Sequence, residues 1–182
     1  RHRYSAIMTG IGTVLADDPL LTCRIENSRN PLRVICDTHL RTPLQARVVT
    51  TSGIAGTLIV TAVTAPEKHQ PYLEAGCDGV ALPERDGHID LNGLMRVLGE
   101  RNIDSVFLEG GGTLNWSALQ SGIVNKVQAY ISPKLFGGSG KTPVAGLGVD
   151  FPDEAFRLSP PTIAMIGEDI LLESEVIRCS QE

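Results

Sequence analysis

Long apolar runs and clustered basic residues are both missing from these 182 residues. No apolar stretch approaches the roughly 20 residues of a transmembrane helix. We expect no signal peptide, since residues 1–4 lead directly into structured-looking sequence. The formal net charge is −5, and no block of Lys and Arg suggests a nucleic-acid partner. We therefore expect a cytoplasmic protein without a membrane span or bound nucleic acid.

Cysteine and histidine are few and scattered. No Cys-x-x-Cys pair occurs among the four cysteines, which are Cys23, Cys36, Cys77 and Cys179. The four histidines are equally dispersed, so the spacing of a zinc site is absent. We predict no metal site, and we expect free, small cysteine side chains in a reducing compartment.

The composition is otherwise that of an ordinary globular chain, with 42% apolar and 20% charged residues. A length of 182 residues favours one domain over two. We therefore assign residues 1–182 to a single domain.

Short apolar runs alternate with helical segments through the middle of the chain. Residues 57–62 form such a run, and residues 66–75 follow with Pro66 in a first helical turn and Gly76 at the end. Residues 78–82 form a second run. The segment after it has the i, i+3, i+4, i+7 spacing of one helix face, at Leu91, Leu94, Met95 and Leu98. This alternation favours a mainly parallel sheet.

The alternation continues to the end of the chain. Residues 106–108 are an apolar strand, a helix then ends near Gly122, and residues 126–132 alternate apolar and polar and close the parallel series. Further strand candidates are residues 6–8, 32–36, 162–166 and 169–177, the last two forming a hairpin. We predict an α/β fold with a mixed, mostly parallel sheet, helices on both faces and a C-terminal antiparallel hairpin.

Glu109 and three glycines separate the strand at 106–108 from a helix that opens near Thr113. Backbone N–H groups at such a turn can hold a phosphate or pyrophosphate, and glycine permits the close approach. The segment lacks the Gly-Lys-Ser/Thr of a P-loop and only partly matches G-x-G-x-x-G. A turn that merely ends a strand stays open as the alternative.

A second candidate site follows the first strand. Two glycines end that strand, and Thr13 is placed to cap a short helix through its hydroxyl. Pro19 stops the helix and favours an extended Asp18, which leaves Asp17 and Asp18 at a loop near Arg24. The carboxylates suit a ribose hydroxyl or a polar substrate edge, and the arginine suits a phosphate. A capped turn with a surface salt bridge fits the spacing equally well.

Two further stretches carry weaker signals. Residues 132–143 are rich in glycine, and their Lys134 and Lys141 suit a phosphate, although a surface loop is the commoner outcome. Residues 50–52 are Thr-Thr-Ser after a predicted strand at 47–49. Their hydroxyls suit the 2′-phosphate of NADPH, but turns are also rich in these residues.

Four segments then occur in a diagnostic order. They are Gly-Thr-Val-Leu-Ala-Asp-Asp-Pro-Leu-Leu-Thr-Cys-Arg at 12–24, Asn-Pro-Leu-Arg-Val-Ile-Cys-Asp at 30–37 with Leu-Arg-Thr-Pro-Leu at 40–44, Leu-Glu-Gly-Gly-Gly-Thr-Leu at 108–114, and Ala-Tyr-Ile-Ser-Pro-Lys-Leu-Phe-Gly-Gly at 129–138. Together they resemble the reductase domain of the bifunctional bacterial riboflavin-biosynthesis protein RibD, which has a dihydrofolate-reductase-like fold. The resemblance covers nearly the whole chain, and its first segment is the most specific.

The resemblance implies an NADPH-dependent enzyme that reduces the ribose of 5-amino-6-(5-phosphoribosylamino)uracil to the ribitylamino product. The sugar ring must open for this reaction, so the hydride would add at C1′. The cofactor supplies the hydride, and the protein holds C4 of the nicotinamide against C1′ and excludes water.

The same resemblance implies roles for individual residues. Thr13 and Asp17 would lie at the cofactor, with Asp17 on the nicotinamide side as the candidate catalytic residue. Substrate contacts would fall on Arg1, Leu21, Arg24 and Glu109, the arginines being suited to its phosphate. Further cofactor contacts would be Thr51, as a looser match, and Gly111, Gly112, Thr113, Leu114, Asn115, Trp116 and Ser117.

Two parts of the family pattern are missing from these residues. One is a first strand carrying a lysine that family members place near the reacting centre. The other is the zinc deaminase domain, since no H-x-E followed by P-C-x-x-C occurs. We expect the natural polypeptide to be longer, with the deaminase domain upstream, and a homodimer formed with help from the C-terminal hairpin.

Two alternatives stay open. A relative of the same fold reduces the pyrimidine before it is deaminated, or reduces a pterin. A nucleotide-binding or dimer-forming module without turnover would share the glycine turn but not the chemistry.

Overall fold

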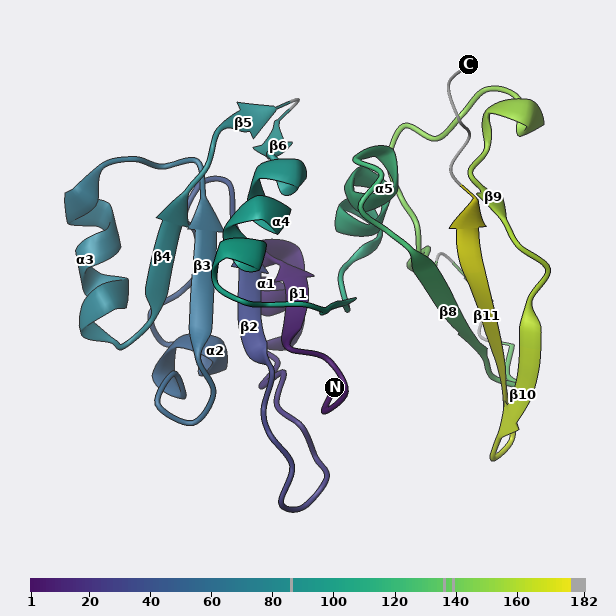
Figure 1. The fold of residues 1–182 in the computed structure, drawn as a ribbon, viewed down its shortest axis with the longest axis horizontal. Helices are drawn as coiled ribbons and strands as arrows, with labels where there is room; N and C mark the ends of the chain where they lie inside the picture. Colours follow the sequence, from purple (N-terminus) through teal and green to yellow (C-terminus); the bar gives the residue numbers. More distant parts are fainter. Residues whose placement is uncertain (86, 136, 139, 178–182) are drawn as a thin grey trace.

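The computed structural model describes residues 1–85, 87–135, 137–138 and 140–177. Three residues from the stretches above lie outside the described residues: Phe136, Ser139 and Cys179. The described chain contains a five-stranded parallel sheet, a four-stranded antiparallel sheet and a small hairpin (Figure 1). The predicted α/β class, with mostly parallel strands and antiparallel strands toward the C-terminus, is confirmed.

The parallel sheet has the strand order β4-β3-β2-β1-β7. Its strands are β1 (Ala6–Gly10), β2 (Leu32–Cys36), β3 (Thr57–Thr61), β4 (Asp78–Ala81) and β7 (Val106–Leu108). Every neighbouring pair is parallel. The carboxyl ends of all five strands therefore meet at one edge, where ligands of open α/β sheets bind.

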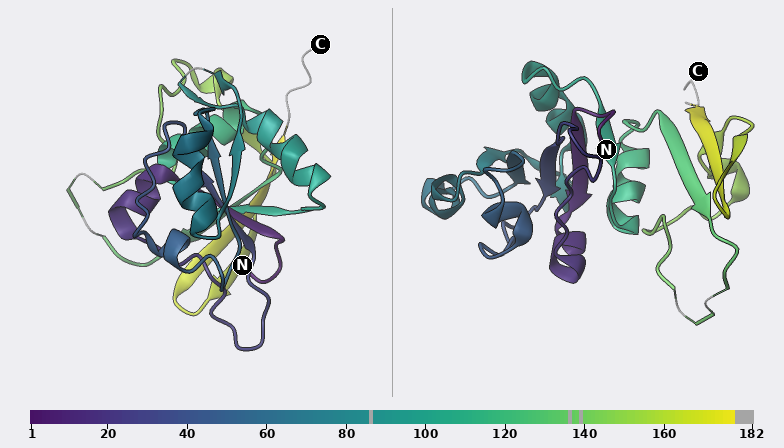
Figure 2. Two further views of the ribbon diagram at one scale, coloured as in Figure 1. Left: turned by 90° about the vertical axis from the view of Figure 1, so that its left-hand side faces the viewer. Right: turned by 90° about the horizontal axis from the view of Figure 1, so that it is seen from below.

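Helices cover both faces of this sheet, as predicted (Figure 2). On one face lie α1 (Ile11–Asp17), α2 (Arg47–Thr50) and α3 (Pro66–Glu74), and on the other lie α4 (Leu91–Glu100) and α5 (Gly112–Gln120). Asp90 caps α4 by accepting a hydrogen bond from the backbone N–H of Gly93 at 3.1 Å. Among the described residues, no helix combines the length and the apolar character that crossing a bilayer requires.

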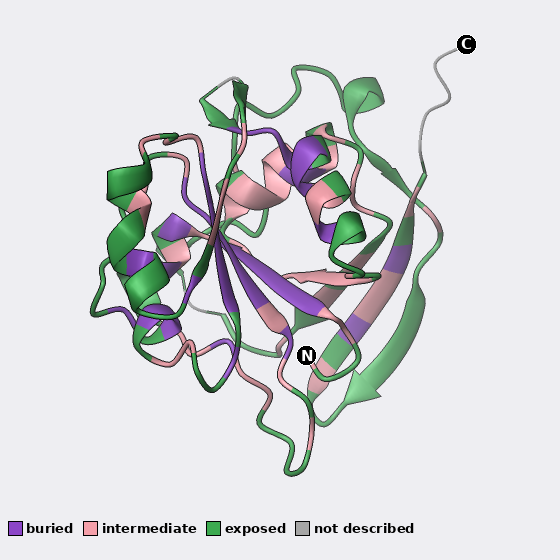
Figure 3. Cartoon of the chain, turned by 60° about the vertical axis from the view of Figure 1, so that its left-hand side comes forward, coloured by how far each residue is buried: buried purple, intermediate pink, exposed green. Residues whose placement is uncertain are grey.

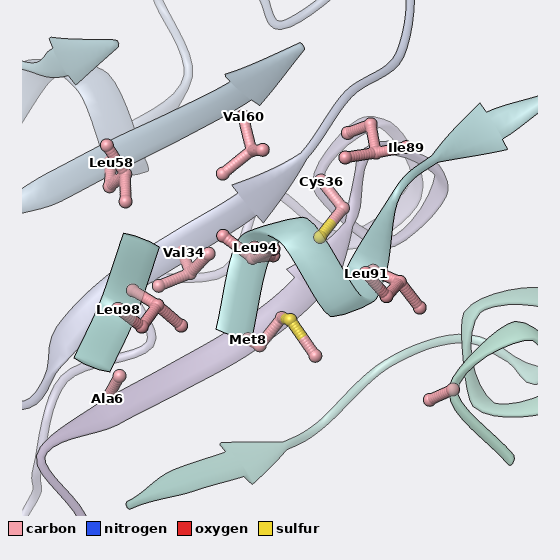
Figure 4. Packing of buried hydrophobic residues seen from close by; sticks show 11 residues of the cluster. Ala6, Met8, Val34, Cys36, Leu58, Val60, Ile89, Leu91, Leu94 and Leu98 are labelled. Carbon is pink, nitrogen blue, oxygen red and sulfur yellow. The ribbon is translucent and has the colours of Figure 1, made fainter. Parts of the chain in front are cut away.

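The core consists of two apolar clusters, because successive side chains of a strand point to opposite faces. One cluster packs beneath α4 and includes Met8, Val34, Leu58, Leu94 and Leu98 (Figure 4). The opposite cluster includes Ile7, Ile35, Ile59, Val14, Val48 and Val49. Strands β1, β2 and β3 are accordingly buried almost throughout (Figure 3).

The second sheet contains β8 (Lys126–Ile131), β9 (Arg157–Leu158), β10 (Thr162–Ile166) and β11 (Asp169–Ile177). The hairpin between β10 and β11 is confirmed. The prediction that β8 continues the parallel series is wrong, because β8 pairs antiparallel with β11. Its alternation of half-buried and exposed residues suits an antiparallel sheet with one face open. Two short elements complete the chain: the hairpin of β5 (Glu84–Arg85) with β6 (His88–Ile89), and a 3₁₀ turn at Pro152–Glu154.

Arg33 on β2 is a fully buried cation. Its guanidinium donates to the backbone carbonyls of Leu20, Thr51 and Ala55 and to the hydroxyl of Thr51. These bonds give both Nη groups of the buried charge hydrogen-bond partners, whereas its Nε has none. They join the 19–22 loop and the segment after α2 to the beginning of β2.

The packing beneath α4 makes a first testable prediction. Leu94 is fully buried, whereas Leu73 on α3 is 49% exposed. We expect Leu94→Ala to lower the free energy of unfolding by about 2–5 kcal/mol, since it removes apolar contacts and leaves a cavity. Leu73→Ala should change it by less than about 1 kcal/mol. Urea unfolding followed by circular dichroism measures both, and equal losses would contradict the proposed core.

Candidate active site

A crevice of about 940 Å³ lies at the carboxyl edge of the parallel sheet. Its walls come from the segments after β1, β2 and β7 and from two loops at 87–91 and 141–143. Three strands that are far apart in sequence thus contribute to one cavity. No group of three or more His, Cys, Asp or Glu side chains within the described part of the chain is arranged to hold a metal ion.

The glycine turn after β7 forms one wall of the crevice. Gly111 is the N-cap of α5, and no side chain caps that helix end. The uncapped N–H groups of a first helical turn attract an anion. A Cβ on Gly111 would lie 3.7 Å from the hydroxyl of Thr13, so a side chain there would fill the space between the α5 N-terminus and α1. The turn therefore fits a phosphate group.

Gly112 has a different role, which is packing. A Cβ at this position would meet the backbone N and Cβ of Ala145 and the carbonyl of Thr142, each at 2.8 Å. The backbone N–H of Ala145 donates to the carbonyl of Gly112 at 3.0 Å. Asn115 donates to the carbonyl of Pro143 at 2.8 Å. The glycine turn thereby holds the 141–145 loop against the crevice.

The segment after β1 forms the adjoining wall. Helix α1 begins at Ile11 with Gly10 as N-cap, so the prediction that Thr13 caps it is wrong; Thr13 lies in the first turn and lines the crevice. Asp18 was expected to be extended, but it adopts a left-handed conformation with φ 39°. Its carboxylate accepts the backbone N–H of Arg47 at 2.8 Å. Of these two acids, Asp17 is therefore the one that lines the crevice, and Leu21 lines it as well.

Arg1, the first residue of the chain, and Glu109, which directly follows β7, form an ion pair. Nε and Nη2 of Arg1 donate to the two carboxylate oxygens of Glu109 at 3.0 and 2.7 Å, and Nη1 donates to the carbonyl of Thr22 at 2.9 Å. Both side chains line the crevice and also a smaller hollow of about 420 Å³. Arg24 lines this smaller hollow, so the charged residues predicted for the substrate gather there.

Three predicted cofactor residues lie outside the crevice wall: Thr51, Asn115 and Trp116. The predicted strand at 47–49 is wrong, because Arg47–Thr50 is helix α2. That helix returns the chain to the amino end of β3, where the hydroxyl of Thr51 bonds Arg33 at 2.8 Å. Trp116 packs edge-on against Phe156, with ring centroids 5.6 Å apart. The remaining residues predicted to contact the cofactor all line the crevice: Thr13, Asp17, Gly111, Gly112, Thr113, Leu114 and Ser117.

Several lining residues were missed by the sequence analysis. Cys36 ends β2 and three others follow it; the rest lie in β6, at the start of α4 and in the 141–143 loop. The eight residues are Cys36, Thr38, His39, Arg41, His88, Ile89, Leu91 and Pro143. Lys141, for which a surface loop was preferred, also lines the crevice. One signal in the sequence could have found the residues after β2. Residues 37–41 directly follow an apolar strand that was expected to be parallel to the strand at 106–108, and parallel strands end at the same edge of a sheet.

The three described cysteines differ in acidity. Hydrogen bonds from the Ser28 side chain and the Ile25 backbone lower the pKa of the Cys23 thiol, which lines the smaller hollow. Burial, with the neighbouring Asp37 carboxylate, raises the pKa of Cys36 to about 12. Burial also raises the pKa of Cys77. Cys36 thus offers the crevice a neutral, apolar surface.

Comparison with known proteins places these observations in a family. The pattern of the RibD C-terminal domain matches residues 1–172. The riboflavin biosynthesis protein RibD of Actinobacillus pleuropneumoniae is 47% identical over 178 residues, which cover 97% of this chain and 47% of that protein. The 2,5-diamino-6-ribosylamino-4(3H)-pyrimidinone 5′-phosphate reductase of Methanothermobacter thermautotrophicus is 38% identical over 180 residues, covering 97% of this chain and 82% of that protein.

Solved structures agree with this result. Acinetobacter baumannii RibD has a TM-score of 0.80 at 24% identity, covering 96% of this chain and 47% of that one, and so shows the shared fold. A Thermotoga maritima diaminohydroxyphosphoribosylaminopyrimidine deaminase/5-amino-6-(5-phosphoribosylamino)uracil reductase has a TM-score of 0.72 at 27% identity. It is covered over 46% of its length, and this chain over 97%. The chain therefore spans about half the length of the RibD relatives that it matches.

The packing at Gly112 leads to a second prediction. Gly112→Ala should displace the 141–145 loop, because the added methyl group meets backbone atoms at 2.8 Å. We expect faster amide hydrogen exchange at Ala145. Gly99→Ala on α4, where nothing lies within 4 Å of the added Cβ, is the matched control. Unchanged exchange at Ala145 in the Gly112 variant would contradict the close packing.

The thiol acidities lead to a third prediction, since the thiolate is the reactive form. In the folded protein at pH 8, we expect iodoacetamide to label Cys23 at least about a hundredfold faster than Cys36, whose pKa is raised from 9.0 to about 12. Mass spectrometry of the digested protein distinguishes the sites, and labelling in denaturant is the control. Equal rates in the folded state would contradict the burial of Cys36.

Proposed function

The chain belongs to the RibD C-terminal domain family, and we propose that it is the NADPH-dependent reductase of riboflavin biosynthesis. The substrate proposed is 5-amino-6-(5-phosphoribosylamino)uracil, whose ribose is reduced to the ribityl chain. One observation carries the proposal: the uncapped N-terminus of α5 and the Arg1–Glu109 pair lie in the walls of one crevice. A dinucleotide and a charged substrate can therefore meet at the same edge of the sheet.

The crevice residues fit a dinucleotide. The N–H groups at Gly111 and Gly112 and the hydroxyl of Thr13 supply donors for the pyrophosphate. Asp17 lines the same wall and is assigned to the nicotinamide side, as the candidate catalytic residue. When bound, the cofactor supplies the hydride for C1′. The protein orients the two reactants and excludes water.

The smaller hollow fits the phosphate of the substrate. Glu109 already neutralises Arg1 through two hydrogen bonds. Arg24 is exposed, and the structure gives it no ion pair with another described residue, so its guanidinium is the one assigned to the phosphate. Glu109 would then contact a polar edge of the pyrimidine end, and Leu21 a more apolar edge.

A second candidate substrate is supported by the Methanothermobacter relative, which is named for the pyrimidine that still carries both amino groups. Steady-state assays with both pyrimidines, followed by NADPH absorbance, decide between them. A higher kcat/KM for the deaminated compound supports the proposed substrate. Binding of NADPH without turnover of either compound would instead indicate a nucleotide-binding module.

Two proposals concern partners. The Thermotoga relative is described as a deaminase and a reductase, so we propose that a deaminase domain upstream in the natural cytoplasmic protein supplies the substrate. The coding sequence upstream of Arg1 tests this directly. We also propose a homodimer, because apolar side chains of the second sheet such as Ile163, Met165 and Ile166 are more than half exposed. Sedimentation of the natural protein measures its mass.

The phosphate assignment makes a fourth prediction. Arg24→Gln in the natural full-length protein should raise the KM for the pyrimidine by about tenfold to a hundredfold, since a charge-assisted hydrogen bond is lost. The Kd for NADPH should stay within twofold. Arg29→Gln, at another exposed position of the same loop, is the control. An unchanged KM in the Arg24 variant would overturn the assignment.

An independent binding measurement uses Cys23, which lines the same hollow as Arg24. Millimolar substrate should slow alkylation of Cys23 in the unmodified protein and should have little effect in the Arg24 variant. Equal protection in both proteins would place the phosphate elsewhere.

A further inference from the structure

The end of the crevice formed by β2 has no role in the function proposed so far. β1 lies between β2 and β7, so this end is farther along the sheet from Glu109 than the glycine turn is. Its lining includes Thr38, His39 and Arg41. A basic side chain at one end of a dinucleotide crevice is a candidate for a specific phosphate contact.

The loop that carries Arg41 is firmly anchored by a buried carboxylate. Asp37 is fully buried, and its Oδ2 accepts the backbone N–H of Thr42 at 2.7 Å and the hydroxyl of Thr42 at 2.8 Å. The hydroxyl of Tyr72 donates to the carbonyl of Thr42 at 2.6 Å. The backbone N–H of Leu40 closes the turn by donating to the carbonyl of Asp37 at 3.1 Å. Arg41 therefore projects from a rigid turn rather than from a loose loop.

Asp37 lies beside the guanidinium of Arg41 but does not occupy its Nη donors. Nε lies 3.8 Å from Oδ1 of Asp37, and the side chain is 55% exposed. Within the part of the chain that the structure describes, this ion pair is the polar contact given to Arg41, and Oδ1 of Asp37 has no hydrogen bond. The two Nη groups thus retain their donors. A guanidinium whose Nε lies at ion-pair distance from a carboxylate keeps its two Nη groups as a pair of donors that matches a phosphate.

The direction of the dinucleotide follows from the arrangement of the sheet. The nicotinamide must lie near the substrate, which the proposed function places at Arg1 and Glu109, and the pyrophosphate lies at the glycine turn. The adenosine half then extends toward β2. There, Ile89 and Leu91 supply an apolar wall that suits the adenine ring.

We propose that Arg41, positioned by Asp37, binds the 2′-phosphate of the adenosine half and makes this site select NADPH over NADH. The inference rests on the proposed function for the direction of the dinucleotide. Each carboxylate that flanks this end of the crevice has a basic neighbour, which reduces its repulsion of a phosphate. Asp37 faces Arg41, and Asp90 lies 3.5 Å from Arg85 and 3.9 Å from Arg96.

The test is calorimetric titration of the natural full-length protein with two matched pairs of ligands. NADPH and adenosine 2′,5′-bisphosphate carry the 2′-phosphate, whereas NADH and adenosine 5′-monophosphate lack it. We expect Arg41→Gln to raise the Kd of NADPH and of adenosine 2′,5′-bisphosphate by about tenfold to a hundredfold. The Kd values of NADH and adenosine 5′-monophosphate should stay within twofold. Arg101→Gln removes an ion pair with Asp78, away from the crevice lining, and should leave the affinity for all four ligands unchanged.

A double variant separates direct contact from charge screening. Removing Arg41 alone leaves the Asp37 carboxylate without its cationic partner. Repulsion between this carboxylate and the 2′-phosphate would by itself weaken the binding of NADPH. In Asp37→Asn with Arg41→Gln this repulsion is absent, so a persistent loss of NADPH affinity supports direct contact. Recovery of wild-type affinity in the double variant would overturn the proposal, as would equal weakening of NADPH and NADH by Arg41→Gln.

The outcome is distinguishable from a failure of the proposed function. Loss of 2′-phosphate discrimination in the Arg41 variant, in a protein that reduces neither pyrimidine, would uphold this inference and refute the reductase. If instead the pyrimidine is turned over, and the wild type and Arg41→Gln show the same preference for NADPH, the reductase is upheld and the Arg41 inference is refuted.

Discussion

The parallel pairing of β1 with β2 on one side and with β7 on the other is the constraint on which the site depends. Residues 6–8, 32–34 and 106–108 align in register, so the three segments that follow these strands emerge together. Only a parallel arrangement brings the turn after each strand to the same edge. The glycine turn, α1 with Asp17, and the Arg41 loop are neighbours for that reason alone, since they are distant in sequence.

β2 shows how the fold keeps this edge in place, because it begins with one buried charge and is followed by another. Arg33 binds the carbonyls of loops at the amino end, and Asp37 binds the loop at the carboxyl end. Removing a charge from water is costly unless its partners are complete. Four hydrogen bonds surround Arg33, whereas Asp37 keeps one oxygen for Arg41 alone. Both Nη groups of Arg33 are thus hydrogen-bonded at the end away from the site, although its buried Nε has no hydrogen-bond partner, and the Asp37 oxygen that accepts no hydrogen bond lies near Arg41 of the crevice.

Much of this was predictable from sequence where a single segment decided the outcome. The strands of the parallel sheet, α3 and α4 follow from apolar runs and helix periodicity. The direction of β8 and the helical form of 47–50 depended instead on partners elsewhere in the chain: β11 for the first, and the apolar cluster around Val48 for the second. Arg41 and His39 were missed for a related reason, because they line the crevice only once β2 lies two strands from β7.

That separation also bears on the two recognition tasks that we propose for the crevice. Adjacent strands lie about 4.8 Å apart, so the ends of β2 and β7 are roughly 10 Å from each other. Side chains at such a distance, with no shared partners, act nearly independently on binding. The pyrimidine contact proposed at Arg1 and Glu109 and the phosphate contact proposed at Arg41 are therefore expected to act independently of each other. Only an extended ligand reaches both ends, and the proposed dinucleotide, crossing β1 with its nicotinamide toward the proposed substrate site, would satisfy this requirement.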